Sequence, residues 1–156
     1  MGIVIQPRRT PRIPPRPRPV IAAVDGSAAG RVAADEAIAS ARDLRAPVLF
    51  VHVRRGPSTV WGRPFYQRRL ERALRKGREA VAAAAARART AGVAAQTEIL
   101  EGPPGLRIAE LARSRDAQLV IVGPRGRRLR ASVFRRVAAM GFPVRRASSS
   151  RRPAHA

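Results

Sequence analysis

Short unbroken runs of apolar residues alternate along this chain with longer segments in which apolar side chains recur at helical spacing. A short unbroken apolar run is typical of a strand that is buried on both faces. The pattern predicts strands at residues 20–24, 48–53, 94–100, 119–122 and 142–145. It predicts helices between them, at residues 27–44, 65–91, 105–115 and 132–140.

This alternation of strands and helices predicts the fold class. Strand–helix–strand units form right-handed crossovers, which place parallel strands in one sheet with helices on both faces. We therefore expect an α/β protein with a doubly wound, mostly parallel sheet, whose central strands are residues 20–24 and 119–122. In such a sheet the ligand crevice lies at the carboxyl ends of the strands, where the strand order switches.

Two strand ends carry the residues that best fit a ligand site. Asp25 follows the first predicted strand, and a Gly-x-x-Gly turn from Gly123 to Gly126 follows the fourth. A strand, a glycine turn and a helix together aim backbone N–H groups at phosphate. Asp25 has two interpretations: it binds a ligand, or it stabilises the amino end of the helix for which Ser27 is the expected N-cap.

Composition narrows the function classes. The chain has 156 residues, enough for one domain, and no cysteine, which excludes disulfides and thiol catalysis. His52 lies in a predicted buried strand, so a role in the core is expected. The sequence offers no combination of a nucleophile, a general base and a residue to orient that base, as a catalytic triad requires. No apolar run reaches the roughly 18 residues of a membrane helix. We expect a non-catalytic protein of the cytoplasm with no membrane partner.

The chain is strongly basic, with a formal net charge of +22. Residues 1–19 combine arginine with proline, residues 145–156 combine arginine with serine, and neither segment contains an acid. Both are predicted to be disordered tails around a domain at residues 20–144, and residues 1–18 are expected to be dispensable for folding. A polycation attracts nucleic acid or acidic proteins. Solvated arginine is the alternative interpretation, because stacking aromatic residues are few.

Asp35 and Glu36 lie on the first predicted helix, which also carries Arg31 and Arg42. Oppositely charged residues three or four positions apart on a helix are neighbours. Asp35 is four positions from Arg31, and we expect both acids to pair with Arg31 or Arg42 on the surface of their own helix.

Several segments occur in an order and spacing that resembles the universal stress protein family, over about residues 20–144. They are Val24-Asp25-Gly26-Ser27, Phe50-Val51-His52-Val53, the long second helix, Glu101-Gly102-Pro103-Pro104 and Val120-Ile121-Val122-Gly123 with Gly126. The resemblance implies an adenine-nucleotide alpha-hydrolase-like sheet of order 3-2-1-4-5, a homodimer and a site for ATP. It places Asp25 and the backbone of Val53 against the nucleoside, and Gly123 and Gly126 near the ribose and phosphates.

The sequence departs from this family at two places. In the ATP-binding members the Gly-x-x-Gly turn is followed, after nine residues, by Gly-Ser or Gly-Thr, and by that count Arg136 and Val137 stand here. Arg136 then either pairs with phosphate or fills its place; since glycine beside phosphate leaves no room for a side chain, weak or lost ATP binding is expected. Arg136→Gly with Val137→Ser is expected to strengthen ATP binding.

The second departure is at the closing strand, where residues 143–147 read Pro-Val-Arg-Arg-Ala in place of the family's Pro-Val-Leu-Val-Val. Two hypotheses for function therefore follow from the sequence. One is a non-catalytic stress-response module with its crevice at Asp25 and the Gly123 turn. The other is an interaction protein whose basic surface and tails bind nucleic acid or acidic partners.

Overall fold

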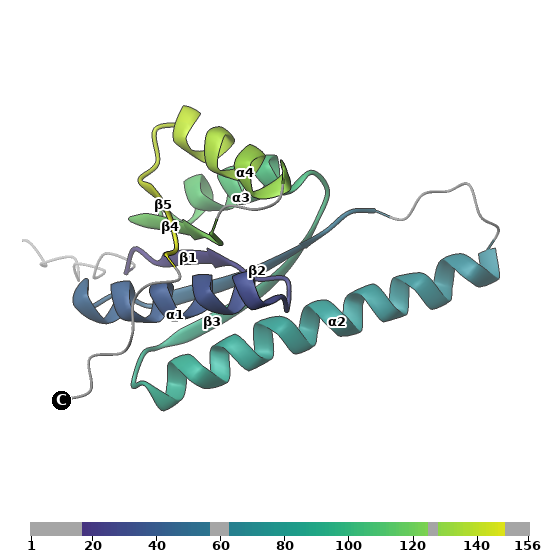
Figure 1. Cartoon of the computed structure of the whole chain (residues 1–156), viewed down its shortest axis with the longest axis horizontal. Coiled ribbons are helices and arrows are strands. Elements are labelled where there is room, and N and C mark those ends of the chain that lie inside the picture. The colour runs from purple at the N-terminus through teal and green to yellow at the C-terminus, as the bar shows by residue number, and fades with distance from the viewer. Residues whose placement is uncertain (1–16, 57–62, 125–127, 149–156) are drawn as a thin grey trace, which may run out of the picture.

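The computed structural model describes residues 17–56, 63–124 and 128–148, without the side chains of residues 63–66 and 128–130. Helices and strands alternate along the chain (Figure 1). The order is β1 (Val20–Ala23), α1 (Ala28–Asp43), β2 (Val48–Arg54), α2 (Arg63–Thr90), β3 (Ala95–Glu101), α3 (Pro104–Ser114), β4 (Leu119–Val122), α4 (Arg128–Ala139) and β5 (Val144–Arg146).

The strands form one parallel sheet of order β3-β2-β1-β4-β5, which confirms the predicted α/β class and the implied strand order. β1 lies at the centre, with Val20 aligned with Val48 of β2 and with Leu119 of β4. Helices α1 and α2 cover one face of the sheet, and α3 and α4 cover the other (Figure 1). Both β1 and β4 are therefore interior strands, as their unbroken apolar runs predict.

Small side chains fill much of the core. Successive strand residues point to opposite faces, so Phe50 packs on the α1–α2 side while Leu49 and Val51 pack on the α3–α4 side. Phe50 is the largest fully buried side chain, and alanine is the most frequent buried residue of α1 and α2. The narrow alanine-rich faces of these helices let them lie close to the sheet.

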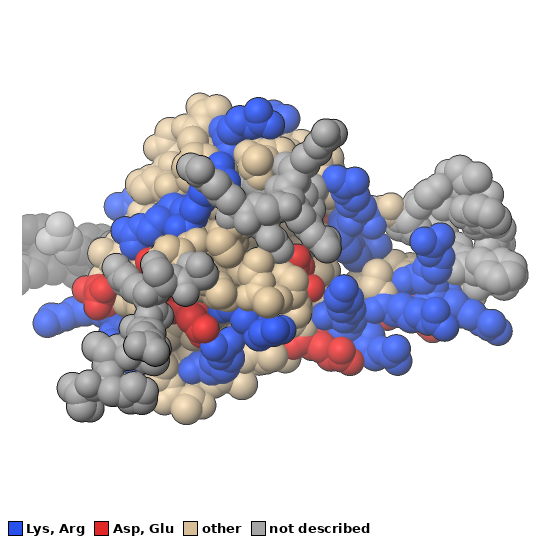
Figure 2. Space-filling view, in the orientation of Figure 1, with Lys and Arg blue, Asp and Glu red and all other residues tan. Residues whose placement is uncertain are grey.

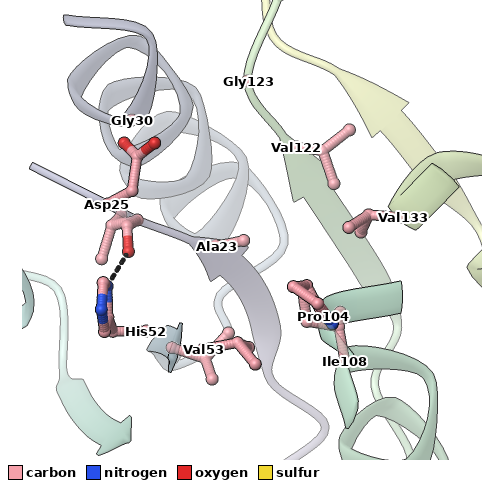
Figure 3. Close-up of a pocket in the computed structure, with 12 residues that line it drawn as sticks. Ala23, Asp25, Gly30, His52, Val53, Pro104, Ile108, Val122, Gly123 and Val133 are labelled. Carbon is pink, nitrogen blue, oxygen red and sulfur yellow. Dashed lines mark hydrogen bonds between the residues drawn. The ribbon is translucent and has the colours of Figure 1, made fainter. Parts of the chain in front are cut away.

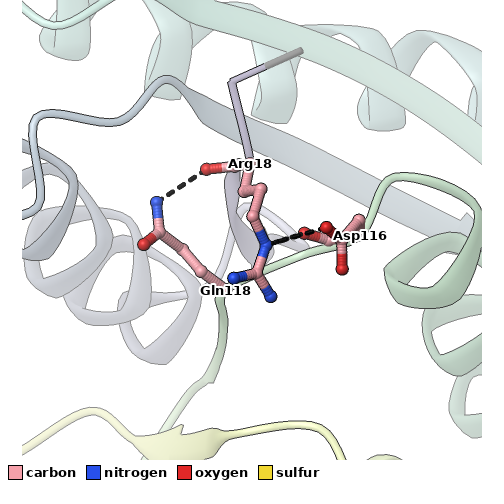
Figure 4. Close-up of polar contacts among 3 residues, drawn as sticks. All are labelled: Arg18, Asp116 and Gln118. Atoms are coloured by element: carbon pink, nitrogen blue, oxygen red, sulfur yellow. Dashed lines mark hydrogen bonds and ion pairs between the residues drawn. The ribbon is translucent and has the colours of Figure 1, made fainter. Parts of the chain in front are cut away.

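The segment before β1 is attached to the domain by polar contacts (Figure 4). Arg18 pairs with Asp116 at 2.9 Å, and the Gln118 side-chain amide donates to the Arg18 carbonyl oxygen at 2.7 Å. The Gln118 backbone N–H donates to the carbonyl oxygen of Pro19, which is buried. Residues 18 and 19 therefore pack on the folded unit, so we expect Arg18 to contribute to stability, against the prediction that residues 1–18 are dispensable. Residues 1–16 lie outside the described residues.

A chain that begins at residue 20 should melt below one that begins at residue 17. The shorter chain lacks the carbonyl acceptors of Arg18 and Pro19 and the ion pair with Asp116, and each lost kcal/mol lowers Tm by about 2–4 °C at this size. Thermal unfolding followed by circular dichroism measures the difference. Asp116→Ala in the longer chain removes only the exposed ion pair with Arg18. This substitution should account for little of the difference in melting temperature. Equal melting temperatures for the two chains would show that Arg18 and Pro19 add nothing to stability, as the prediction of a dispensable tail requires.

The fifth strand forms despite its two arginines. β5 pairs with β4, Ala147 donates its N–H to the Val122 carbonyl oxygen at 2.8 Å, and the Ala147 side chain is buried. Arg145 lies 3.4 Å from the buried carboxylate of Glu36 on α1, whereas Arg146 stacks over the ring of Phe134 on α4 at 4.3 Å. The two arginines thus bind opposite helix layers, and the folded segment continues beyond the boundary predicted at residue 144.

Helix α2 extends past the sheet (Figure 1). Its 28 residues span about 42 Å at 1.5 Å each, whereas the seven-residue strands β2 and β3 each span about 23 Å. From residue 77 onward one side of α2 is buried, through Gly77, Val81, Ala84, Ala85 and Ala88. Residues 67–76 contain no fully buried side chain. We call residues 67–79, of which only Gly77 is buried, the projecting segment of α2.

Candidate functional site

A pocket lies at the carboxyl ends of the three central strands, where the order of the sheet switches (Figure 3). Asp25 follows β1, Val53 lies near the end of β2, and Gly123 follows β4. Pro104 of α3 and Val133 of α4 contribute further apolar wall. Three of the four predicted site residues thus line one pocket, although 98 positions separate Asp25 from Gly123. Gly126 lies outside the described residues.

The pocket is small and mostly apolar. Its volume is about 80 Å³, below the roughly 300–1,000 Å³ of pockets that enclose a whole drug-sized ligand. Figure 3 shows Asp25 and His52 on one side of it and Val122, Val133 and Ile108 on the other. A flat apolar group with a polar edge fits these walls, whereas charged groups attached to it would remain outside the pocket.

Asp25 stabilises the beginning of α1. Its Oδ1 accepts hydrogen bonds from the Ser27 backbone N–H at 3.0 Å and from the Ser27 hydroxyl, while Ser27 Oγ accepts from the Gly30 N–H at 3.1 Å. Ser27 is the N-cap of α1, as predicted. Figure 3 shows the carboxylate directed toward Gly30 at the start of this helix. The capping role is therefore present, and Asp25 also stands at the pocket rim.

His52 is a pocket residue that the sequence interpretation assigned to the core. Its Nδ1 donates to the Val24 carbonyl oxygen, at 2.9 Å, because a carbonyl can only accept. The ring is half-buried and lies directly beneath Gly77 of α2, where a Cβ atom would approach Cδ2 to 2.6 Å. The hydrogen bond and this close contact fix the ring at the wall of the pocket.

Arg136 and Val137 do not stand at the start of α4, where the backbone N–H groups of a helix bind phosphate. The count of nine residues after Gly126 assumes an extended turn, but α4 already begins at Arg128, so residues 136 and 137 lie in its third turn. Val137 is fully buried against the sheet, and Arg136 is exposed beside α3. The small, hydroxyl-bearing pair nearest the start of α4 is Ala131-Ser132. Val137 is therefore not accessible to a phosphate, whereas Arg136 lines a cavity beside the pocket and stays a candidate phosphate contact.

The sequence could not have supplied the remaining walls of the pocket. Pro104, Ile108 and Val133 are apolar residues in the first two turns of α3 and α4. Their only signal is helical spacing, which any core-facing residue shares.

In the part of the chain that the structure describes, no group of three or more His, Asp or Glu residues could hold a metal ion. None of the described helices is long and apolar enough to cross a membrane.

The geometry defines a doubly wound α/β protein with a crevice at its switch point. The sequence profile described as "Universal stress protein family" matches residues 17–139. The chain therefore belongs to the universal stress protein family, and its sheet has the adenine-nucleotide alpha-hydrolase-like arrangement. No curated protein sequence matches the chain.

Solved structures of this family have the same fold. A universal stress family protein from Burkholderia pseudomallei is 25% identical with a TM-score of 0.70, and the match covers 85% of this chain and 96% of that one. The universal stress protein from Archaeoglobus fulgidus in complex with dAMP is 21% identical with a TM-score of 0.66, covering 84% and 98%. A family member from Arabidopsis thaliana with AMP bound is 18% identical with a TM-score of 0.64, covering 88% and 97%.

Proposed function

We propose that this protein is a non-catalytic module that binds an adenine nucleotide, with the base and ribose at the pocket formed by the ends of β1, β2 and β4. The observation that carries the proposal is the convergence of Asp25, Val53 and Gly123 on one apolar pocket at the switch point. The complexes of related structures with dAMP and AMP support the same ligand class.

Each part of the pocket has a definite task in this proposal. The apolar walls contact the flat base, and the Val53 backbone and Asp25 meet the polar edge and the ribose. The N–H of Gly123, directly after β4, approaches the first phosphate. Since the pocket encloses little of the ligand, affinity for AMP is expected to be modest, and ATP binding through the Gly123 turn alone is expected to be weak.

Nucleotide-free protein should bind AMP saturably, and Asp25→Ala should weaken that binding about 5–150-fold, which corresponds to a loss of about 1–3 kcal/mol. Isothermal titration calorimetry measures both. Ser27→Ala is the matched control, because it removes the same helix cap and lowers stability by about 1 kcal/mol but alters no residue of the pocket wall. Absence of AMP binding by the wild-type protein refutes the proposal. If both variants lose the same affinity for AMP, Asp25 acts only by stabilising the start of α1.

The projecting segment of α2 favours a second candidate function, contact with the phosphate backbone of nucleic acid. Figure 2 shows Lys and Arg side chains gathered along this part of the helix. Within the described residues only Arg75 of the segment has an acidic partner, Glu79 at 4.0 Å. The exposed basic residues of the segment are Arg68, Arg69, Arg72, Arg75, Lys76 and Arg78.

Arg68→Glu with Arg72→Glu should reduce affinity for a short DNA duplex by about tenfold or more relative to a control of equal net charge. Arg113→Glu with Arg135→Glu is that control, since both residues are exposed and lie on other helices. Each phosphate contact contributes about −0.9 to the slope of log K against log salt, so the first variant should flatten the slope by about 2. Fluorescence anisotropy over a salt series gives both values. Identical behaviour of the two variants would show that net charge alone attracts DNA.

A further inference from the structure

A second cavity adjoins the site pocket on its α3–α4 side. Its volume is about 440 Å³, and it lies between the residues that follow β2, the turn before α3, and α4. Pro104 lines both cavities, while Ser132 and Val133 are consecutive residues of α4 that face one cavity each. The two cavities are therefore neighbouring parts of one crevice. We call the larger one the arginine cleft.

The walls of the arginine cleft are basic. Arg55 contributes from the end of β2 and Arg136 from α4, and none of the lining residues is acidic. Within the described residues neither arginine has an ion-pair partner. The other arginines at this corner are neutralised, because Arg54 pairs with Glu101 and Arg107 pairs with Glu110 at 2.9 Å.

The floor of the cleft is formed by small or rigid residues. Gly102, with a φ of +128°, makes the turn that precedes α3, and Gly105 allows α3 to lie against α4. A Cβ atom at Gly105 would come within 3.3 Å of the Ser132 carbonyl oxygen and of the Arg136 Cβ. The close approach of the two helices holds the backbone that carries Ser132 and Arg136 at the cleft wall.

We propose that the arginine cleft binds the distal phosphates of an adenine nucleotide, an inference that rests on the function proposed above. A nucleotide with its base in the small pocket must extend outward, and the neighbouring open space is positively charged and carries a hydroxyl. Guanidinium groups bind phosphate oxygens by charge-assisted, bidentate hydrogen bonds. This position is separate from the Gly123 turn, which receives the first phosphate. The ligand class is thus a nucleotide with two or more phosphates.

Three ligands separate this inference from the proposed function: AMP, ATP and inorganic tripolyphosphate. Calorimetry on wild type, Arg55→Gln and Arg136→Gln should show each substitution lowering affinity for ATP and tripolyphosphate about tenfold, with AMP affinity unchanged. Arg135→Gln is the matched control, an exposed arginine beside Arg136 that does not line the cleft. It should leave all three affinities within about twofold.

Each outcome decides one of the two proposals. If Arg135→Gln lowers tripolyphosphate affinity as much as Arg136→Gln does, binding reflects net charge and the cleft assignment is wrong. The assignment is also wrong if wild type binds ATP no more tightly than AMP. A wild-type protein that binds tripolyphosphate through Arg55 and Arg136 but does not bind AMP overturns the proposed function and supports the cleft as a phosphate site. Thermal melts identify any variant that fails to fold.

Discussion

Arg136→Gly with Val137→Ser should destabilise the protein by about 2–4 kcal/mol and should leave its affinity for ATP no higher. Val137 is fully buried between α4 and the sheet, so serine there loses apolar contact and buries a hydroxyl. Glycine within a helix adds about 1 kcal/mol. This expectation reverses the one drawn from the spacing of the motif, because the two residues lie in the third turn of α4.

Urea unfolding measures the loss of stability, and calorimetry with ATP measures binding. Arg136→Ala is the appropriate control, since it keeps a good helix former at an exposed position and should change stability by less than about 0.5 kcal/mol. If the double variant is as stable as the wild type and binds ATP more tightly, Val137 faces the phosphate after all and Arg136 obstructs binding, and our placement of both residues is wrong.

Gly77→Ala should also destabilise the protein, by about 1–3 kcal/mol, although alanine is ordinarily the better helix residue. The new methyl group would lie 2.6 Å from Cδ2 and 3.1 Å from Nε2 of His52. The ring cannot turn away without losing the hydrogen bond from Nδ1 to the Val24 carbonyl oxygen. Helix α2 must therefore move outward from the sheet.

A double-variant cycle identifies the cause of this loss. His52→Ala removes the ring, so Gly77→Ala in that background should cost nothing or should stabilise α2 by up to about 1 kcal/mol. Chemical denaturation of the four proteins gives the coupling energy. Gly92→Ala does not serve as a control, because Gly92 has a φ of +73° that strains any side chain. An unchanged cost in the His52→Ala background would locate the strain elsewhere.

The strands were predictable because burial on both faces leaves a local signal. β4 has the bounds that its apolar run predicts, and Ser27 caps α1 as its position before the helical pattern indicates. The carboxyl ends of parallel strands meet at one edge of a sheet, so Asp25 and Gly123 could be paired across 98 positions. The topology of the sheet was therefore enough to predict that Asp25 and Gly123 lie at the same pocket.

Contacts between side chains of different elements left no comparable signal. Asp35 pairs with Arg87 of α2 rather than with its own helix, and the carboxylate of Glu36 is buried facing Arg145, so the prediction of surface pairs on α1 was wrong. The placement of Val137 beside a phosphate failed for the same reason. A residue count along the chain does not show where a turn ends and a helix begins, and a few residues of helix carry a position far from the strand end.

The extension of α2 beyond the sheet gives this one helix two different local stabilities. Amide hydrogens of residues 81–88 are protected because this part of the helix packs on the core. Their exchange with solvent requires global unfolding of the domain. Those of residues 67–76 depend on helix propensity and partial contacts, and an isolated stretch of this length is marginal in water. The basic surface therefore stands on a segment that can fray and re-form while the pocket at the switch point stays intact. A polyanion bound to this segment would slow hydrogen exchange only in the first half of the helix.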